Sequence, residues 1–350
     1  MTRRTTSLAV AGLVLAALVC VAVFVPMPYV VMSPGVTENT LGQVDGKPVI
    51  TITGHPTFAT TGHLDLTTVS VTSPDSHPRL PDILRAWWSA DDIVLPRDVV
   101  YPPQDSVGDV QQQNKTAMLG SQSDAVAAGL AEAGVDAVEV TVQGVTTGEP
   151  ADGVLRMGDE IVAVDGTVVE STQAAVSAIE NLPPGSRVTL SIRRGGNDRS
   201  VVLTTVASTD DPSTSRIGVT LSDVFEPPFT VNIDLGQDIG GPSAGLMFSL
   251  GIYDLLTPGP LTGGRYIAGT GTIDMSGTVG PIGGIQQKIA GAYANGATVF
   301  LVPADNCEEA GQSSLAAKLD LVEVSTMDGA VQALQSYDNG TESELARCGG

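Results

Sequence analysis

The stretch GPIGGIQQKIAGAYANGATVFLVP, residues 280–303, contains a Pro-Gly turn, a helix and a strand in immediate succession. Its apolar positions recur at i, i+4, i+7 and i+8, which predicts an amphipathic helix over residues 284–295. The apolar run ATVFLVP at 297–303 then predicts a strand. Because strands and helices alternate in this way from residue 216 onward, the C-terminal part of the sequence predicts an α/β layered fold.

Lys288 lies on the apolar face of that predicted helix, where a lysine is costly. The residues of this face are Ile285, Ile289, Ala292 and Tyr293. Gln286 and Gln287 take the solvent side, where a lysine would cost nothing. Because burial of an ammonium group lowers its pKa, a buried Lys288 can be neutral near pH 7 and act as a general base.

Two structural roles compete with a general base for Lys288. Its alkyl stem can run along apolar surface and keep the ammonium group in water. It can also form a buried ion pair with Asp238 or Asp274. Both roles would be structural, and the residues alone leave all three open.

The stretch DIGGPSAGLMFSLG, residues 238–251, places Ser243 between a Gly-Pro corner and an apolar run that predicts a helix over 243–256. A serine in that position is usually a helix N-cap. A serine nucleophile needs a base, and no histidine occurs after His77. The local sequence also lacks the strand-to-elbow context of an α/β-hydrolase and a Ser-x-x-Lys pair. A base for Ser243 therefore has to come from elsewhere in the sequence, and Lys288 is the candidate.

These elements together resemble the proteolytic domain of Lon peptidases, which are Ser-Lys dyad enzymes of the S16 type. The segments GGPSAG (240–245), AGTGTI (268–273) and GPIGGIQQK (280–288) follow one another in the order of that family. The resemblance implies a mixed α/β (α+β) proteolytic domain. It assigns the nucleophile to Ser243 and the general base to Lys288.

The resemblance also implies supporting groups around the dyad. Thr270 corresponds to the threonine that hydrogen-bonds the lysine amine, and Gly241 and Ala244 belong to the turn whose backbone N–H groups would hold an oxyanion. One departure is Gly240, because many Lon enzymes have an acidic residue two positions before the proline of the motif. No GxxxxGK[ST] sequence occurs, so the protein resembles Lon without its ATPase, and no cofactor or metal is expected.

Residues 136–207 predict a small β-rich domain. Its segment GDEIVAVDG (158–166) resembles the PDZ family, in the circularly permuted form of bacterial envelope proteases. The resemblance implies a groove that takes an extended peptide or the C-terminus of another protein as an added strand. The alternative is a degenerate PDZ domain that only spaces or gates. The polar residues 208–215 predict a linker, and residues 216–345 the Lon-type domain.

The N-terminus predicts a single transmembrane signal anchor. Residues Ser7–Val25 carry no charge, and Arg3 and Arg4 precede them. This pattern favours a span over residues 7–26, with residues 1–6 in the cytoplasm and the remainder of the protein extracytoplasmic. The alternative is a cleaved signal peptide, but the sequence after the apolar run offers no small-x-small cleavage site.

Residues 36–135 predict strand-like pieces and a helix over 121–134. An anchor, a PDZ domain and a Lon-type domain together resemble the YlbL-like family of PDZ-containing Lon-like proteases. In that light 36–135 either supplies the first part of the Lon-type domain, with the PDZ domain inserted into it, or forms a separate region before both. Trp87 and Trp88 pack against the sheet or lie at a membrane interface, of which sheet packing is the commoner arrangement.

Composition excludes several kinds of function. The 39 acidic and 17 basic residues give a formal charge of −22, which repels phosphate backbones and argues against nucleic-acid binding. The three histidines form no HExxH motif and the three cysteines no CxxC motif, so a zinc site is not expected. Cys20 lies in the predicted span, whereas Cys307 and Cys348 can form one extracytoplasmic disulfide.

The sequence thus predicts an ATP-independent, membrane-anchored serine endopeptidase that cuts envelope or membrane-released protein segments presented by its PDZ domain. One alternative is a catalytically silent scaffold that binds the termini of envelope proteins. Another is a Ser-Lys esterase that acts on small acyl groups. The Lon resemblance further implies a homo-oligomeric ring, which is a hexamer in that family.

Overall fold

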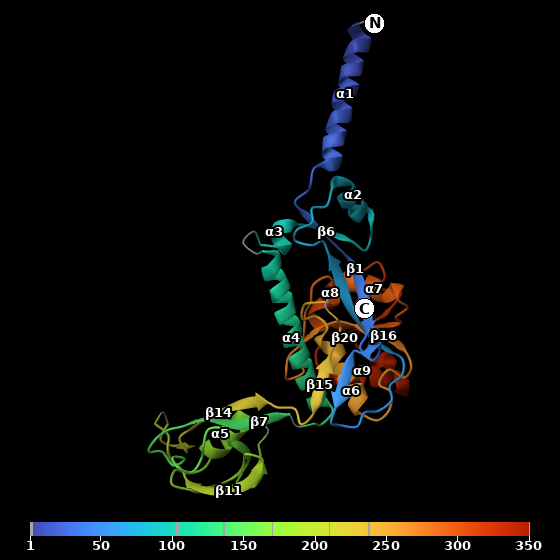
Figure 1. Cartoon of the computed structure of the whole chain (residues 1–350). Helices are drawn as coiled ribbons and strands as arrows, with labels where there is room; N and C mark the ends of the chain where they lie inside the picture. The colour runs from blue at the N-terminus through green and yellow to red at the C-terminus, as the bar shows by residue number, and fades with distance from the viewer. Residues whose placement is uncertain are drawn as a thin grey trace. The chain divides into compact units, whose positions relative to one another are not determined.

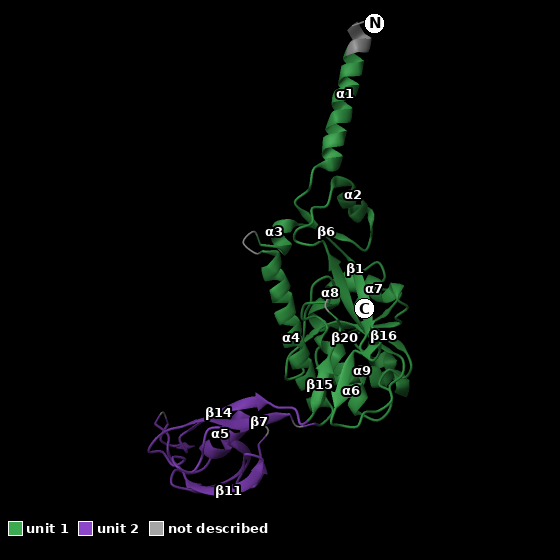
Figure 2. Ribbon diagram, viewed as in Figure 1, with its two compact units in different colours: residues 1–134, 229–350 green, residues 135–228 purple. Residues whose placement is uncertain are grey.

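The computed structural model describes residues 3–102, 106–135, 137–169, 171–209, 211–236 and 239–349, without the side chains of residues 3–6. The protein divides into two compact units (Figure 2). The larger unit combines Met1–Gly134 with Phe229–Gly350, and the smaller unit is Val135–Pro228. Two segments that are distant in sequence therefore build one unit together.

A six-stranded mixed sheet forms the centre of the larger unit (Figure 1). Its strands in spatial order are β20 (Asp320–Val324), β19 (Val299–Pro303), β16 (Tyr266–Gly269), β5 (His63–Val71), β1 (Tyr29–Asn39) and β6 (Ile93–Pro96). Neighbours from β20 to β5 are parallel, whereas β1 is antiparallel to both β5 and β6. The segment before residue 97 thus supplies three of the six strands.

Helices cover both faces of this sheet. On one face lie α7 (Ile285–Ala294) and α8 (Cys307–Gly311), where Ile285 and Ile289 share a core with Phe300 of β19. Ala268 of β16 belongs to the same core, and because successive side chains of a strand point to opposite faces, the next residue faces the other side of the sheet. There Gly269 of β16 leaves room for Met247 of α6 (Gly245–Leu256), since a Cβ on Gly269 would come within 2.7 Å of the methionine sulfur. Helix α6 packs in turn on α4 (Val107–Glu132) and α9 (Met327–Asn339).

The remaining elements of the larger unit surround this layered core. They are α1 (Arg3–Phe24), β2 (Gln43–Val44), β3 (Lys47–Pro48), β4 (Ile50–Thr53), α2 (Leu80–Trp88), α3 (Arg97–Val100), β15 (Thr230–Ile233), β17 (Thr272–Ile273), β18 (Val279–Gly280), η1 (Ala304–Asn306) and η2 (Glu342–Glu344). Strand β15, which follows the smaller unit in sequence, pairs with β4 from the N-terminal segment. This pairing joins the two segments of the larger unit a second time.

Two helices differ in detail from the sequence prediction. Gln287 of α7 is buried, with 1% of its surface exposed, and Tyr293 is 43% exposed, so these two assignments are wrong. The reason is tertiary, because Nε2 of Gln287 donates to the carbonyl of Asp91 in a segment 196 residues away. Helix α4 begins at Val107, well before the predicted start at 121, because Ser106 caps the N–H of Asp109.

The smaller unit is built on an antiparallel sheet with the order β11-β10-β8-β7-β14 and one helix packed against it. Its elements are β7 (Val138–Val145), β8 (Glu160–Val164), β9 (Thr167–Val168), α5 (Thr172–Glu180), β10 (Arg187–Arg194), β11 (Asn197–Thr204), β12 (Val206–Ala207), β13 (Ser215–Arg216) and β14 (Val219–Phe225). Alternating inward side chains such as Val188, Leu190 and Ile192 of β10 form its core.

The boundary after this unit differs from the predicted one at residue 216. Strand β14 pairs along its whole length with β7, so it belongs to the smaller unit and not to the Lon-type domain. The segment 208–215, expected to be a linker, ends in a strand residue that pairs with Ala207. The sequence pattern of β14 is that of any strand, and only its pairing partner shows to which unit it belongs.

Two further features concern the ends of the protein. The apolar helix α1 includes an 18-residue stretch, Ser7–Phe24, with a mean hydropathy of 2.7, and it is long enough to cross a membrane.

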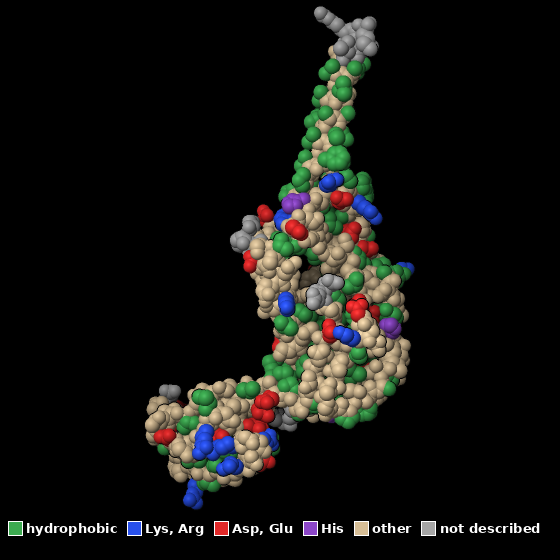
Figure 3. All heavy atoms as spheres, viewed as in Figure 1, with side chains coloured by type: hydrophobic (Ala, Val, Ile, Leu, Met, Phe, Trp, Pro, Cys, Tyr) green, Lys and Arg blue, Asp and Glu red, His purple; other side chains and the backbone are tan. Residues whose placement is uncertain are grey.

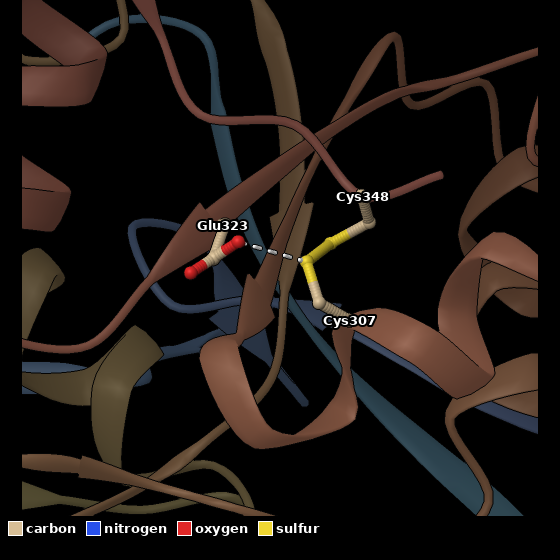
Figure 4. Close-up of a disulfide and its surroundings, with 3 residues drawn as sticks. All are labelled: Cys307, Glu323 and Cys348. Carbon is tan, nitrogen blue, oxygen red and sulfur yellow. Dashed lines mark hydrogen bonds between the residues drawn. A yellow bond between two sulfur atoms is a disulfide. The ribbon is translucent and has the colours of Figure 1, made fainter. Parts of the chain in front are cut away.

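Near the C-terminus, Cys307 and Cys348 form a disulfide with a Cα–Cα distance of 4.9 Å (Figure 4). The carboxylate of Glu323 lies beside this bridge. The disulfide attaches the C-terminal segment to the start of α8.

Candidate active site

Ser243 lies in the turn that precedes α6. The N-cap of α6 is Ala244, which makes no side-chain cap bond, and the helix begins at Gly245 instead of the predicted residue 243. Gly241 turns the backbone with φ of 90°, a conformation that favours glycine. The hydroxyl oxygen of Ser243 accepts a hydrogen bond from Lys288, so the cap interpretation of this serine is wrong.

Helix α4 holds this turn in place. Ser121 is buried and its hydroxyl donates to the carbonyl of Pro242 at 2.9 Å. The N–H of Gly241 donates to the carbonyl of Asn114 at 3.2 Å. Neither Ser121 nor Asn114 was singled out from the sequence, because both lie more than 100 residues before the serine in a stretch with ordinary helical composition.

Lys288 reaches the same point from the opposite face of the sheet. Its side chain is only 2% exposed. The amine Nζ donates to Oγ of Ser243 at 2.7 Å and to Oγ1 of Thr270 at 2.9 Å. Burial lowers the pKa of Lys288 from 10.5 to about 7. Near neutral pH a large share of Lys288 is therefore unprotonated and able to accept a proton.

Thr270 connects the two residues of this pair. It follows β16 directly and is fully buried. Its hydroxyl donates to the backbone carbonyl of Ser243 at 2.9 Å, which leaves its lone pairs for the lysine amine. The N–H of Gly271 donates to the same carbonyl at 2.9 Å. The orientation of the lysine amine and the position of the serine turn are thus coupled through one threonine.

Within the described residues, no carboxylate forms an ion pair with Lys288. Asp274, one of the two partners considered from the sequence, accepts hydrogen bonds from Ser276 and from the N–H of Thr278. The other, Asp238, lies outside the described residues. The hydrogen-bond partners of the amine in the described residues are two hydroxyl groups, so no negative charge there offsets the cost of burying a positive one.

The three histidines have other partners. His63 stacks on Tyr266, with ring centroids 4.0 Å apart, and its Nδ1 lies 3.4 Å from Asp65. His55 contacts Phe229, and His77 bonds a backbone carbonyl in its own turn. A histidine base for Ser243 therefore has no support in the hydrogen bonds of the described part of the protein.

The Ser243–Lys288 pair lies at the wall of a cavity of about 730 Å³. Gly240–Ala244 line one side, and Pro281–Gly283 line another. A third side comes from Thr67–Ser70 of β5, a stretch that extends past Gly269, the last residue of the neighbouring strand β16. Thr67–Ser70 could not be predicted from the sequence, because nothing in a strand so far before Ser243 indicates which place in the sheet it will occupy.

Asn306 fixes the segment Pro281–Gly283 in the wall of the cavity. It is 6% exposed, and its side chain accepts from the N–H of Ile282 at 2.8 Å and donates to the carbonyl of Ile282 at 3.0 Å. Asn306 immediately precedes Cys307 of the disulfide. This residue was also missed, and its position just after a buried strand is the only sequence signal that would have pointed to it.

Comparison with known families identifies both units. The family described as Lon protease (S16) C-terminal proteolytic domain matches residues 237–336. The PDZ domain family matches residues 110–205, which begin within α4 and end before β14. The protein has a Lon-type S16 proteolytic domain and a PDZ domain. The Lon-type match contains the complete cluster of Ser243, Thr270 and Lys288.

Curated relatives point to the same family. Lon protease 2 of Herpetosiphon aurantiacus is 30% identical over 174 residues, which are 49% of this chain and 21% of that protein. Lon protease 1 of Sorangium cellulosum is 40% identical over 95 residues, which are 26% of this chain and 11% of that protein. The matched part therefore spans about a fifth or less of the length of these relatives.

A solved structure resembles the PDZ part. The PDZ domain of an SdrC-like protein from Listeria monocytogenes is 29% identical, with a TM-score of 0.22, over 23% of the present protein and 85% of that domain structure.

The larger unit without α1 is called the Lon-type unit from here on, and the smaller unit is called the PDZ unit.

Proposed function

We propose that this protein is an ATP-independent serine endopeptidase in which Ser243 is the nucleophile and Lys288 the general base. The observation that supports it most directly is the 2.7 Å contact between Nζ and Oγ, made by a lysine whose pKa burial lowers to about 7. A nucleophile and base within hydrogen-bond distance, with the base oriented by a third group, is the arrangement that such catalysis requires.

The proposed reaction begins with a neutral Lys288. Its amine takes the proton of Ser243 as Oγ attacks the carbonyl carbon of a peptide bond. The resulting ammonium group gives that proton to the departing amine, which leaves an ester on Ser243. Lys288 then accepts a proton from the water that attacks the ester and returns a proton to Oγ as the carboxylic acid product leaves, which restores both the serine and the neutral amine. Thr270 accepts a hydrogen bond from the lysine throughout and keeps the amine directed at Oγ.

The negative charge on the substrate oxygen needs hydrogen-bond donors. The backbone N–H groups of Ser243 and Ala244 lie at the N-terminal end of α6, where the helix dipole favours negative charge. Gly241 has a different role in this proposal, because its N–H already donates to Asn114. Gly241 supplies the sharp turn, and Ala244 supplies a donor.

The location of the protein is also part of the proposal. Helix α1 serves as a signal anchor with its N-terminus in the cytoplasm, and both units lie on the extracytoplasmic side. An uncharged 18-residue stretch preceded by two arginines supports this orientation. The disulfide between Cys307 and Cys348 supports it independently, because such bonds persist in oxidising compartments.

The substrates we propose are unstructured segments of envelope or membrane-released proteins, which the PDZ unit binds as an added strand. No GxxxxGK[ST] motif occurs in the sequence, which supports hydrolysis without ATP. Assembly into a ring is proposed from the Lon family alone. The competing candidate is a silent scaffold with the same PDZ function and no turnover.

The decisive experiment compares the purified full-length protein with its Ser243→Ala variant on an unstructured protein such as casein. We expect cleavage by the wild type without ATP, unchanged by a metal chelator, and none by the variant. Cleavage of small esters without cleavage of casein would favour the esterase alternative. Lack of turnover by a folded wild-type protein that still binds peptides would favour the scaffold.

A further inference from the structure

The two tryptophans of the protein are consecutive in the sequence, and both are exposed. Trp87 and Trp88, at the end of α2, are 74% and 86% exposed. The other face of α2 is buried through Ile83 and Ala86, which pack on the Lon-type unit. Packing against the sheet, which the sequence made the commoner expectation, is therefore wrong for both tryptophans. Exposure of two large indole rings on one short helix calls for another explanation.

Helix α2 starts next to the C-terminal end of α1, the proposed membrane span (Figure 1). Pro26 forms a β-bridge with Arg79, the N-cap of α2, and the N–H of Met27 donates to the carbonyl of Pro78 at 3.0 Å. The guanidinium of Arg79 also lies 5.6 Å from the ring centre of Phe24, the last residue of α1. These contacts fix the start of α2 at the level where the apolar helix ends.

The tryptophans lie at the far end of α2, no more than the length of that helix from this level. A helix of nine residues is about 13 Å long, and the headgroup layer extends roughly 5–8 Å beyond the hydrocarbon core of a bilayer, so the proposal requires α2 to run along the membrane surface and not away from it. An indole ring is apolar with one N–H donor, which is why tryptophan concentrates at the membrane–water interface. Hydrophobic side chains cover α1 and occur again beside its C-terminal end, together with basic, acidic and histidine side chains (Figure 3).

We propose that Trp87 and Trp88 insert into the headgroup layer of the bilayer that α1 spans, so that α2 fixes the Lon-type unit to the membrane surface. This inference rests on the proposed membrane span. A single helix followed by a short connection would leave the unit free to rotate, whereas a second contact beside it restricts the orientation of the active site. Leu84, on the same helix and also exposed, widens the apolar contact.

Tryptophan fluorescence tests the proposal directly, because the sequence contains only these two tryptophans. The full-length protein is reconstituted into phosphatidylcholine vesicles with or without bromine atoms high on the acyl chains. We expect the brominated lipid to reduce the emission at least about twofold, and acrylamide in the water to quench it at least about threefold less than in the protein unfolded by guanidinium.

A control places a single tryptophan far from the membrane. In a Trp87→Phe/Trp88→Phe background, Phe58→Trp puts the probe beside Leu255, at the end of α6. Phe58 precedes the start of β5, which pairs with the end of β1, and the 11 residues of β1 span roughly 35 Å from Tyr29 near the anchor. This probe should be open to acrylamide and unaffected by bromine.

The outcomes separate the two proposals. Extraction of the protein from vesicles by alkaline carbonate would contradict the membrane span itself. If the protein stays in the vesicles but acrylamide quenches its native tryptophans as strongly as the Phe58→Trp probe, only the docking of α2 is overturned. Tryptophans shielded from acrylamide but not quenched by bromine would also overturn it, and would indicate a protein contact at α2.

A second measurement asks whether the contact orients the active site. The Trp87→Ser/Trp88→Ser variant should cleave a free peptide at the wild-type rate, since neither residue touches the cavity. On a peptide tethered to the vesicle surface by a short linker, its rate should fall at least about threefold. Equal rates of variant and wild type on the tethered peptide would contradict an orienting role.

Discussion

Lys288 in the Lon-type unit and Asp159 in the PDZ unit are buried to the same degree, with 2% and 1% of their surfaces exposed. Asp159 has a partner for its charge, since Arg194 donates two hydrogen bonds of 2.6 Å to its carboxylate. Burial alone would raise the pKa of Asp159, but the bonds from Arg194 and from the N–H of Arg156 outweigh it and lower the pKa. Lys288 has hydroxyl partners only, so burial dominates and its pKa falls to about 7.

The free-energy cost of burying a charged group is thus compensated in one unit and left uncompensated in the other. In the PDZ unit a charge-assisted pair satisfies a buried carboxylate and fixes β10 against the turn before β8. In the Lon-type unit the cost of burial is left in place, and a neutral amine near pH 7 is the result. Of these two residues, the one without a charged partner lies at the candidate active site, and the paired one holds two parts of the PDZ unit together.

The largest effect is expected from Lys288→Met. Loss of the general base should reduce kcat on casein by about a thousandfold, within the range of such catalysis. Lys288→Arg should be equally inactive, because arginine stays protonated. The matched control is Lys318→Gln, an exposed lysine in the same unit, which should retain wild-type turnover. Turnover by Lys288→Met within tenfold of wild type would contradict the dyad.

The same Lys288→Met variant should be more stable than the wild type. The folded-state pKa of Lys288 lies below its unfolded value, so folding releases a proton between about pH 7 and 10.5, and stability rises with pH over that range. Methionine removes that cost, and unfolding by urea at pH 7 should require on the order of 2 kcal/mol more. A loss of stability would indicate that Lys288 is a structural residue after all.

Arg194→Met should have the opposite consequence in the PDZ unit. It leaves the buried carboxylate of Asp159 without its charged partner, which costs about 3 kcal/mol. The control is Arg193→Met in the neighbouring, more exposed pair with Glu160, where a loss of about 1 kcal/mol or less is expected. Unfolding of both variants, followed by urea denaturation, measures this difference. Equal losses would mean that burial does not distinguish the two pairs.

The pH dependence of turnover gives a smaller effect. Because only the unprotonated amine of Lys288 can accept a proton, kcat should rise with pH through about 7 and then level off. At pH 6 the rate should be about tenfold below the plateau. Measurement of casein cleavage from pH 5 to 9 checks this, and a rate that is flat from pH 5 to 7 would exclude Lys288 as the base.

The smallest effect concerns Asp254, a third fully buried ionisable residue. Burial raises its pKa to about 6, although Oδ1 accepts from the N–H of Leu261 at 2.7 Å. A raised carboxyl pKa makes wild-type stability fall as pH rises from about 4 to 6. Asp254→Asn keeps the acceptor and removes the charge, so it should gain about 1 kcal/mol at pH 7 and nothing at pH 4. An equal gain at both pH values would contradict this account.

The sequence predicted the local direction of side chains better than the boundaries between units. The position of Lys288 on the inward face of its helix can be read from local periodicity, because it depends only on neighbours within two turns of that helix, and Lys288 is indeed buried. The strand β14 was assigned to the wrong unit and Gln287 to the wrong face. Both errors arise from partners far away in sequence, which no local pattern encodes.

The sequence by itself determined which residues can act: a serine at a helix start, a lysine that the helix periodicity turns inward, and an apolar helix that can cross a membrane. Only the tertiary structure decided that they meet. The serine turn and α7 approach each other from opposite faces of the sheet, and β5 of that sheet forms a third side of the cavity beside them. Periodicity fixes the direction of a side chain, whereas sheet order and packing fix what lies in that direction.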